Sequence, residues 1–319
     1  MKARNKDPRP KFDATYALSS GGTSSGGKSN TYYKNIEKNT FKIPGVTSSA
    51  FGVLTLSKRL HSSLGSQRKG GKYLAASGLV GTTSTINIDV INVRTGGAAA
   101  DFGDLSNNRR DYPASGATCS IGLICGGYDV DAAAITDSID RIDFATNSDA
   151  TSFGVLASAN RNAGSYANSL YIYAAMGIDG TPTAQTGYQR RCFKSGAATE
   201  TITNLFVEQT KINSSVFVCN ENSAFRVGGI DSTNYYDGLE FMCLRNATSA
   251  ALSATLAVAS GGASGASSQT RGMYMKGNTG TLLYPSTSYY MDYKTKSTVT
   301  LFVSAAGVSR GQVSGYGCG

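Results

Sequence analysis

The chain has 319 residues, of which 16% are charged and 38 are glycine, and its formal net charge is +9. Low charge with abundant glycine excludes helical bundles and coiled coils, which need long stretches rich in Glu, Lys and Leu. No stretch reaches the roughly 18 apolar residues of a membrane-spanning helix, so we expect a soluble, all-β protein of many short strands.

The first part of the chain, residues 1–14, is interpreted as a basic N-terminal arm. Its charged residues are Lys2, Arg4, Lys6, Asp7, Arg9 and Lys11. Because no apolar region follows them, the segment does not have the pattern of a signal peptide. We expect either a solvated tail or an arm that docks on an acidic surface, followed by a single domain at 15–319.

A four-residue motif recurs at intervals of 51 residues. Its copies begin at Phe51, Phe102 and Phe153, and their glycines are Gly52, Gly103 and Gly154. In each copy an arginine stands eight residues after the phenylalanine, and these are Arg59, Arg110 and Arg161. Weaker counterparts at 202–205, 252–256 and 299–301 continue the interval. A fixed period of this length is the signature of a repeat architecture.

A second signal keeps the same interval: a short apolar strand that ends in one or two glycines. It occurs six times, and its copies end at Gly22, Gly78, Gly127, Gly177, Gly229 and Gly277. The pairs Gly126-Gly127 and Gly228-Gly229 are typical. Glycine permits backbone torsions that other residues avoid and lets neighbouring backbones approach closely.

A third strand is expected after each glycine, at 32–36, 86–93, 139–144, 188–193, 239–244 and 289–293. Each unit then reads as four strands, with glycine after the second and the Phe-Gly motif in the fourth. Four short strands in about 50 residues match one blade of a β-propeller.

The two ends of the chain complement each other. The first recognisable strand, at Tyr16, is of the second type, whereas residues 312–318 follow Arg310 where a strand of the first type belongs. We predict that residues 311–318 pair beside residues 15–22. The segments 15–56 and 311–319 then form one composite blade, which closes a six-bladed propeller and removes two open sheet edges.

This pattern resembles kelch-type propellers, although the chain lacks the tryptophan of their fourth strand. Residues 100–105 and 139–156 look like repeats in kelch-like structural proteins of tailed bacteriophages. The resemblance implies a non-enzymatic virion protein of the tail, fibre, collar or capsid exterior, assembled in the host cytoplasm. Other virion proteins would be its partners, in several copies per particle, with host-surface glycans as a further candidate.

The repeated arginines point to a candidate binding face, because alternating strand directions place their loops at one end of every blade. Arg310 joins Arg59, Arg110 and Arg161 in that register. The other candidates on this face are Asp129, Asp131, Asp179, Asp231, Tyr235 and Tyr236. The face could bind acidic sugars or an acidic protein; alternatively, each arginine ties one blade to the next by bonding loop carbonyls.

No catalytic, metal or cofactor site is expected. The single histidine, His61, has no catalytic motif around it, and the six widely spaced cysteines are interpreted as buried reduced thiols. Asp129 and Asp131 alternate as in a calcium loop but lack the rest of that pattern, so they are interpreted as turn acids. No basic and aromatic cluster suggests nucleic acid. The alternatives are a glycan-active propeller enzyme or lectin, and an intracellular kelch-type interaction hub.

Overall fold

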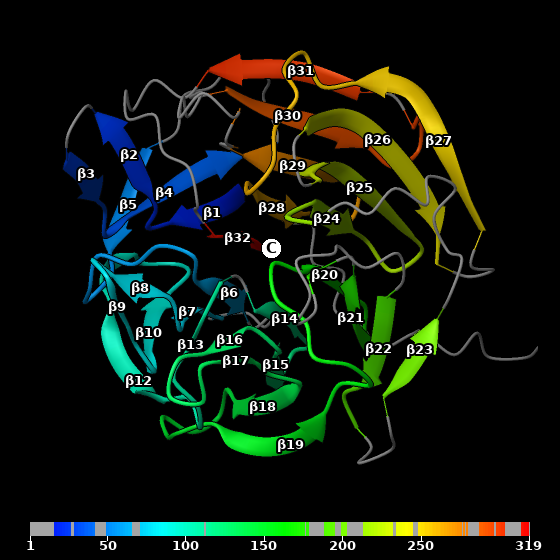
Figure 1. The fold of residues 1–319 in the computed structure, drawn as a ribbon. Coiled ribbons are helices and arrows are strands. Elements are labelled where there is room, and N and C mark those ends of the chain that lie inside the picture. Colours follow the sequence, from blue (N-terminus) through cyan, green and yellow to red (C-terminus); the bar gives the residue numbers. More distant parts are fainter. Residues whose placement is uncertain are drawn as a thin grey trace, which may run out of the picture.

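Regular structure in this protein is β-strand throughout the part of the chain that the computed structural model describes (Figure 1). The described residues are 16–26, 29–41, 49–65, 71–111, 113–175, 177–178, 188–194, 199–202, 213–231, 234–244, 248–275, 277, 279, 287–296, 298–303 and 314–318. Within these ranges there is no helix, and hence none long and apolar enough to cross a membrane. The expected all-β class is therefore confirmed.

Within the described ranges, six antiparallel sheets have four main strands each, and we number them 1 to 6 in chain order. Taken from the centre of Figure 1 outwards, sheet 1 contains β32 (Ser314–Cys318), β1 (Tyr16–Ser20), β4 (Asn35–Thr40) and β5 (Ser49–Val53). Sheet 2 contains β6 (Ser62–Gly65), β7 (Lys72–Ala76), β10 (Asn87–Asn92) and β12 (Ala100–Asp104). Sheet 3 contains β14 (Ala114–Ala117), β15 (Ile121–Cys125), β18 (Ser138–Asp143) and β19 (Thr151–Val155).

The second half of the chain repeats this order. Sheet 4 contains β20 (Gly164–Ala167), β21 (Tyr171–Ala175), β22 (Tyr188–Cys192) and β23 (Glu200–Ile202). Sheet 5 contains β24 (Val216–Cys219), β25 (Ser223–Ile230), β26 (Tyr235–Cys243) and β27 (Thr248–Thr255). Sheet 6 contains β28 (Ser264–Ser267), β29 (Arg271–Met275), β30 (Thr287–Asp292) and β31 (Thr298–Val303).

The innermost strands contact one another in a closed cycle. Strand β6 contacts β14, β14 contacts β20, and the contacts continue through β24 and β28 to β32, which returns to β6 (Figure 1). Their inner edges are joined in part by serine: the Ser115 amide donates to Ser165 Oγ at 3.0 Å, and the Cys219 amide donates to Ser267 Oγ at 2.8 Å. The innermost strand of a sheet has no further strand beside it, so these serine hydroxyls serve as hydrogen-bond acceptors for two of its backbone amides.

Six apolar cores follow the same cycle, because each lies between two neighbouring sheets. Between sheets 2 and 3, for example, Leu74 and Phe102 pack with Ile124 and Ile142. The other five cores lie between sheets 1 and 2, 3 and 4, 4 and 5, 5 and 6, and 6 and 1. Strands that are buried on both faces tend to be apolar along their length, as β15 is, whereas the third strands also bury charged residues such as Asp89 and Asp140.

The strand nearest the end of the chain completes sheet 1. Strand β32 pairs antiparallel with β1 over five residues, from Tyr16 opposite Cys318 to Ser20 opposite Ser314. This is the pairing that we expected for residues 311–318 and 15–22. Strand β1 thus has a partner on each side, since β4 pairs with its other edge.

The expected third strand of the first unit, 32–36, is wrong in its position. The structure has β4 at Asn35–Thr40 instead, and residues 29–32 belong to a separate hairpin of β2 (Thr23–Gly26) and β3 (Ser29–Tyr32). Four of the five later third strands begin within two residues of their expected starts, and β26 begins at Tyr235, four residues before the expected 239. The error arises because the hairpin inserts between the second and third strands.

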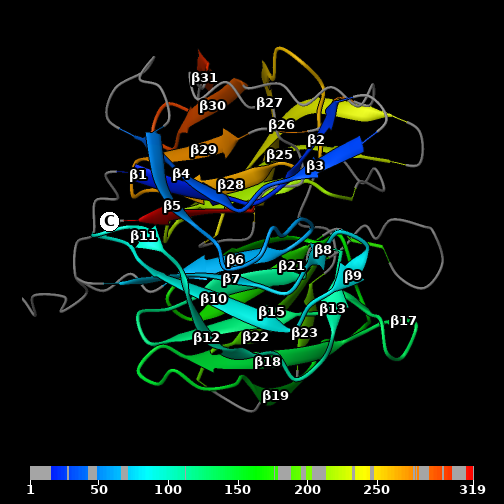
Figure 2. The same ribbon diagram turned by 90° about the vertical axis from the view of Figure 1, so that its left-hand side faces the viewer.

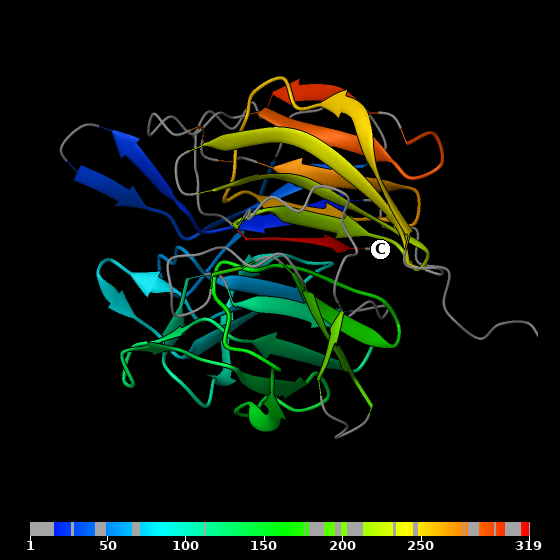
Figure 3. The ribbon, with the colours of Figure 1, turned by 45° about the vertical axis from the view of Figure 1, so that its right-hand side comes forward.

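Sheets 2 and 3 carry short hairpins in the same connection. These are β8 (Leu79–Val80) with β9 (Thr83–Ser84), and β16 (Tyr128–Asp129) with β17 (Ala134–Ile135). Strand β13 (Arg109–Arg110), which precedes sheet 3, pairs with the other edge of β16. Figures 2 and 3 show that the hairpins of sheets 1, 2 and 3 lie on one face of the molecule. We call this the hairpin face.

The glycines that end the second strands connect neighbouring sheets. The amides of Gly22, Gly78, Gly127 and Gly229 each donate to a carbonyl at the entrance to the next sheet, on Lys58, Arg109, Asn160 and Ser260 respectively. The preceding glycine in sheet 3, Gly126, has φ +67°, and a Cβ there would lie 2.3 Å from the Asn160 oxygen. Both the torsion and the close approach therefore require glycine at this position.

The Phe-Gly motif lies in the fourth strand, as expected. Gly52, Gly103 and Gly154 each stand opposite an isoleucine of the third strand, next to an irregularity in the register. Gly103 and Gly154 have φ of +141° and +118°. These glycines therefore serve a β-bulge in the outermost strand, where residues with a Cβ would be strained.

Candidate functional site

Two buried ion pairs occupy equivalent positions in sheets 2 and 3. Lys58 Nζ lies 3.0 Å from Asp89 Oδ2, and Arg109 Nη2 lies 3.1 Å from Asp140 Oδ2; all four side chains are at most 1% exposed. Each cation directly precedes a repeated arginine, and each acid lies on the third strand of its sheet. Burial lowers the pKa of both cations, and the neighbouring aspartate opposes this shift.

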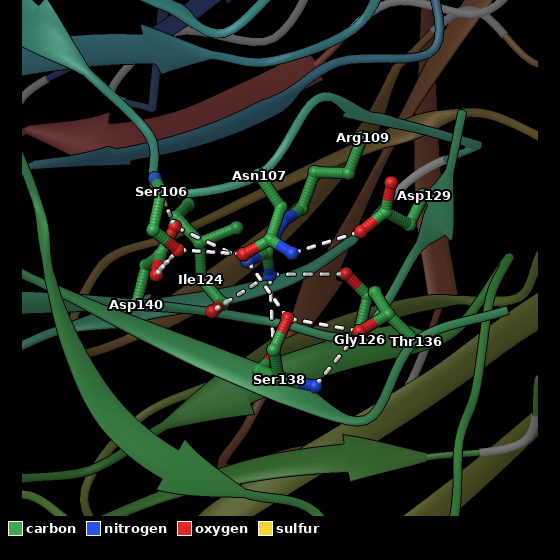
Figure 4. A network of polar contacts seen from close by, with 9 residues as sticks. All are labelled: Ser106, Asn107, Arg109, Ile124, Gly126, Asp129, Thr136, Ser138 and Asp140. Atoms are coloured by element: carbon green, nitrogen blue, oxygen red, sulfur yellow. Dashed lines mark hydrogen bonds and ion pairs between the residues drawn. The ribbon is translucent and has the colours of Figure 1, made fainter. Parts of the chain in front are cut away.

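Figure 4 shows how the sheet 3 pair is enclosed in polar contacts. Arg109 Nη1 donates to the carbonyls of Gly126 at 3.2 Å and Ser138 at 3.1 Å, and its Nη2 donates to Ser138 Oγ at 2.9 Å. Asp140 also accepts bonds from the amide and the hydroxyl of Ser106. These bonds satisfy both terminal nitrogens of Arg109 and both carboxylate oxygens of Asp140, which offsets part of the cost of burying the ion pair.

The other sheets vary this arrangement. In sheet 4, Gln189 replaces the acid and accepts from the Ser158 amide at 3.0 Å. In sheet 5, Arg226 of the second strand pairs with Glu240 of the third at 2.9 Å, and both are buried. A buried polar contact with the third strand therefore recurs in at least four sheets, although its partners differ.

Asp129 is held inside the loop that begins the hairpin of sheet 3. Its carboxylate accepts from Asn107 Nδ2 at 2.8 Å, as Figure 4 shows. It also accepts from the amides of Asp131 and Ala132 at 3.0 and 3.1 Å. Burial alone would raise the pKa of Asp129, but these hydrogen bonds outweigh it, and the pKa lies below its ordinary value. Asp129 is the last residue of β16, and its carboxylate fixes the turn that follows, whereas Asp131 is exposed.

Two of the repeated arginines, Arg110 and Arg161, contact the ring of Tyr128, which precedes Asp129. The guanidinium carbon of Arg110 lies 5.0 Å from the centroid of the Tyr128 ring, and that of Arg161 lies 5.5 Å from it. Arg110 and Tyr128 are neighbours in the pairing of β13 with β16. Arg161 Nη1 also forms an ion pair of 2.9 Å with Asp111 Oδ2. We call Arg110, Tyr128 and Arg161 the tyrosine stack.

The first repeated arginine makes an analogous contact. Arg59 lies 5.2 Å from the ring centroid of Tyr32, which belongs to the hairpin of sheet 1, and its backbone pairs with Leu79 of sheet 2. The arginines thus lie where the hairpins of neighbouring sheets meet. We expected these arginines to bond loop carbonyls of the neighbouring blade. Instead, the guanidinium groups of Arg110 and Arg161 contact the Tyr128 ring, and Arg161 also pairs with Asp111. The bonds to carbonyls between the sheets come from glycine amides.

Three of the remaining candidates belong to sheet 5 and the loop between its second and third strands. In sheet 5, Asp231 accepts from the Tyr236 hydroxyl at 2.6 Å and from the Asn234 amide at 2.6 Å, so this acid closes its own loop. Tyr235 is partly buried, which raises its pKa. Asp179, Arg310 and the basic arm at 1–14 lie outside the described residues.

His61 is buried between sheets 1 and 2, with 1% of its surface exposed. Its Nε2 lies 2.9 Å from Ser20 Oγ, which in turn lies 2.5 Å from the Tyr73 hydroxyl. These contacts join β1 to the neighbouring sheet and agree with the expected structural role. Since β1 also pairs with β32, His61 supports the place where the two ends of the chain meet.

The cysteines agree only in part with the expectation of buried thiols. Cys125 is buried, whereas Cys119, Cys192, Cys219 and Cys243 are partly exposed. Burial raises the pKa of both Cys125 and Cys219 to about 12. Thiolate chemistry is therefore disfavoured at these two positions.

The described part of the chain contains no group of three or more His, Cys, Asp or Glu side chains that could hold a metal ion. Sequence reasoning missed Lys58, Arg109, Asp89 and Asp140 as important residues. The signal was available, because each pair recurs at the 51-residue interval of the motif. No protein-family model matches the chain, and no curated protein has significant similarity to it.

Proposed function

We propose that this protein is a six-bladed β-propeller that serves as a non-enzymatic structural and binding component of a tailed-bacteriophage particle. In this proposal sheets 1 to 6 are the blades, and β32 completes the first. The cyclic contacts of the innermost strands and the six cores between neighbouring sheets support this architecture.

The particle assignment rests on the resemblance of residues 100–105 and 139–156 to phage repeats. In this proposal the protein lies on the tail, fibre, collar or capsid exterior and docks on another virion protein. Several copies per particle would raise the avidity of weak contacts with a host surface.

A binding function is favoured over a catalytic one because the buried charged residues of sheets 2 and 3 make structural contacts. Lys58, Asp89, Arg109 and Asp140 are enclosed within sheets 2 and 3, and Asp129 fixes a turn. These groups stabilise the hairpin face, on which Arg110 and Arg161 remain partly exposed. A rigid scaffold that presents loops in this way is typical of recognition proteins.

Mass spectrometry of gradient-purified virions tests the assignment. We expect peptides of this chain at a stoichiometry of several copies per particle, after washing with high salt. A host cytoplasmic protein of similar abundance in the lysate serves as the contamination control. Recovery of the chain in the lysate but not in the particles would contradict the proposal.

A further inference from the structure

The tyrosine stack contains guanidinium donors that the described structure does not use. Arg110 contacts the Tyr128 ring but forms no hydrogen bond or ion pair through its side chain within the described residues. The Arg110 side chain is half-buried rather than buried, so its terminal nitrogens remain available to an acceptor from outside the chain.

Three acids that the structure describes near the stack are already engaged. Asp111 pairs with Arg161, Asp140 pairs with Arg109, and Asp129 accepts from its own loop and from Asn107. Asp131 is exposed and lies 3.5 Å from Asn108 Nδ2. Arg110 is therefore the cation of this cluster whose charge no ion pair within the described residues balances.

The geometry of the stack prepares Arg110 for an anion. Its backbone is fixed by the pairing of β13 with β16, and its guanidinium plane is supported by the Tyr128 ring. A guanidinium held by an aromatic ring keeps its donor edge available, and its planar fork matches a carboxylate or a phosphate. Arg161 lies against the same ring and adds a second set of donors.

We propose that Arg110, Tyr128 and Arg161 form a binding site for the carboxylate or phosphate group of an anionic surface polysaccharide. This inference rests on the proposed function, since it names the ligand class of the hairpin face. Arg110 provides the principal contact, Arg161 a second contact, and Tyr128 orients both. The contact of Arg59 with Tyr32 offers a similar pair of side chains at the preceding junction.

Isothermal titration calorimetry with small probes tests the site. The probes are sodium glucuronate for a carboxylate sugar and glycerol 1-phosphate for a phosphate polymer, with glucose as the neutral control and sodium chloride at matched ionic strength. We expect at least one anionic probe to bind, while glucose and chloride do not. Binding of glucuronate alone would identify an acidic sugar, and binding of glycerol phosphate alone would identify a phosphate-bearing polymer.

Three variants locate the binding. Arg110→Gln is expected to weaken binding of that probe about tenfold or more, whereas Arg110→Lys, which keeps the charge but loses the planar fork, gives a smaller loss. Arg94→Gln removes the same charge from an exposed position at the other end of sheet 2 and should leave affinity unchanged. The melting temperature of each variant shows whether it is folded.

The proposal is overturned if neither anion binds, or if Arg94→Gln weakens binding as much as Arg110→Gln does. It is also overturned if Arg110→Gln and Arg161→Gln, both folded, retain the affinity of the original protein. These results are independent of virion mass spectrometry. A protein found in particles without anion binding would contradict this inference alone, whereas binding by a protein absent from particles would contradict the particle assignment.

Discussion

Lys58 and Arg109 show how individual charged residues can stabilise a sheet from inside. Each cation enters from the loop that precedes its sheet, crosses to the third strand and bonds there to an aspartate and to backbone carbonyls. The sheets are therefore held by polar contacts as well as by the apolar cores between them. Because these groups are removed from water, loss of one partner exposes the full desolvation penalty of the other.

Asp140→Ala is expected to lower the free energy of unfolding by about 3–5 kcal/mol, because it leaves Arg109 buried without its counter-charge. Urea denaturation followed by tyrosine fluorescence measures the loss. Asp143→Ala serves as the matched control, since Asp143 lies 3.9 Å from Arg141 in an exposed pair and should contribute less than about 1 kcal/mol. Equal losses in the two variants would refute a special role for the buried pair.

Alkaline pH is expected to destabilise the protein. Burial raises the pKa of Cys125 and Cys219 from 9.0 to about 12, and that of Tyr290 from 10.0 to about 12. The folded state thus favours their neutral forms, and this contribution is complete below about pH 9 and lost as the pH rises towards 12. Denaturation between pH 8 and 11 should show a falling free energy of unfolding, with a shallower fall in Cys125→Ala. A constant value across that range would contradict the prediction.

At the scale of elements, the turns after the second strands act as connectors between sheets. Residues at the entrances to sheets 3 to 6 add a further series of bonds: the amide of Asn162 donates to the Asp111 carbonyl, that of Ser214 to Asn162, and that of Gly262 to Ser214. All four residues have positive φ, between 53° and 64°. One local conformation is thus used repeatedly to connect successive sheets.

Gly126→Ala is expected to destabilise the protein more than Gly81→Ala does. Both glycines have φ near +65°, so the torsional penalty of about 1 kcal/mol is shared. A Cβ on Gly126 would meet the Asn160 carbonyl oxygen, whereas nothing lies within 4 Å of a Cβ on Gly81. The difference in melting temperature between the two variants therefore measures the cost of the steric clash between sheets 3 and 4. A similar melting temperature for both would show that the junction yields easily.

The sequence predicted the elements that depend on spacing and missed those that depend on contacts. Glycine turns, the Phe-Gly strand and the pairing of residues 314–318 with 16–20 follow from a period that can be seen in one chain. The hairpin at 23–32 was not predicted, because its residues are mostly small and polar and do not alternate between apolar and polar. The Arg109 and Asp140 pair was missed for another reason: its partners meet only once the register between a loop and the third strand is known.

For the whole molecule, the pairing of β1 with β32 makes one sheet depend on segments from both ends of the sequence. Deletion of residues 313–319 is expected to abolish cooperative thermal unfolding, because it removes the inner strand of sheet 1 and the contacts of that strand with β6 and β28. Circular dichroism and calorimetry measure the change. A synthetic peptide of residues 313–319 added in trans should restore part of the transition, and an unaltered melting profile in the truncated chain would contradict the closure.

The same pairing has a consequence for biosynthesis. A ribosome that adds roughly 5–20 residues per second completes β1 some tens of seconds before it completes β32. During that interval the inner edge of β1 has no strand beside it, and an uncovered edge of this kind favours aggregation. We therefore expect a chaperone that covers the edge of β1 until β32 emerges to improve the yield of soluble protein.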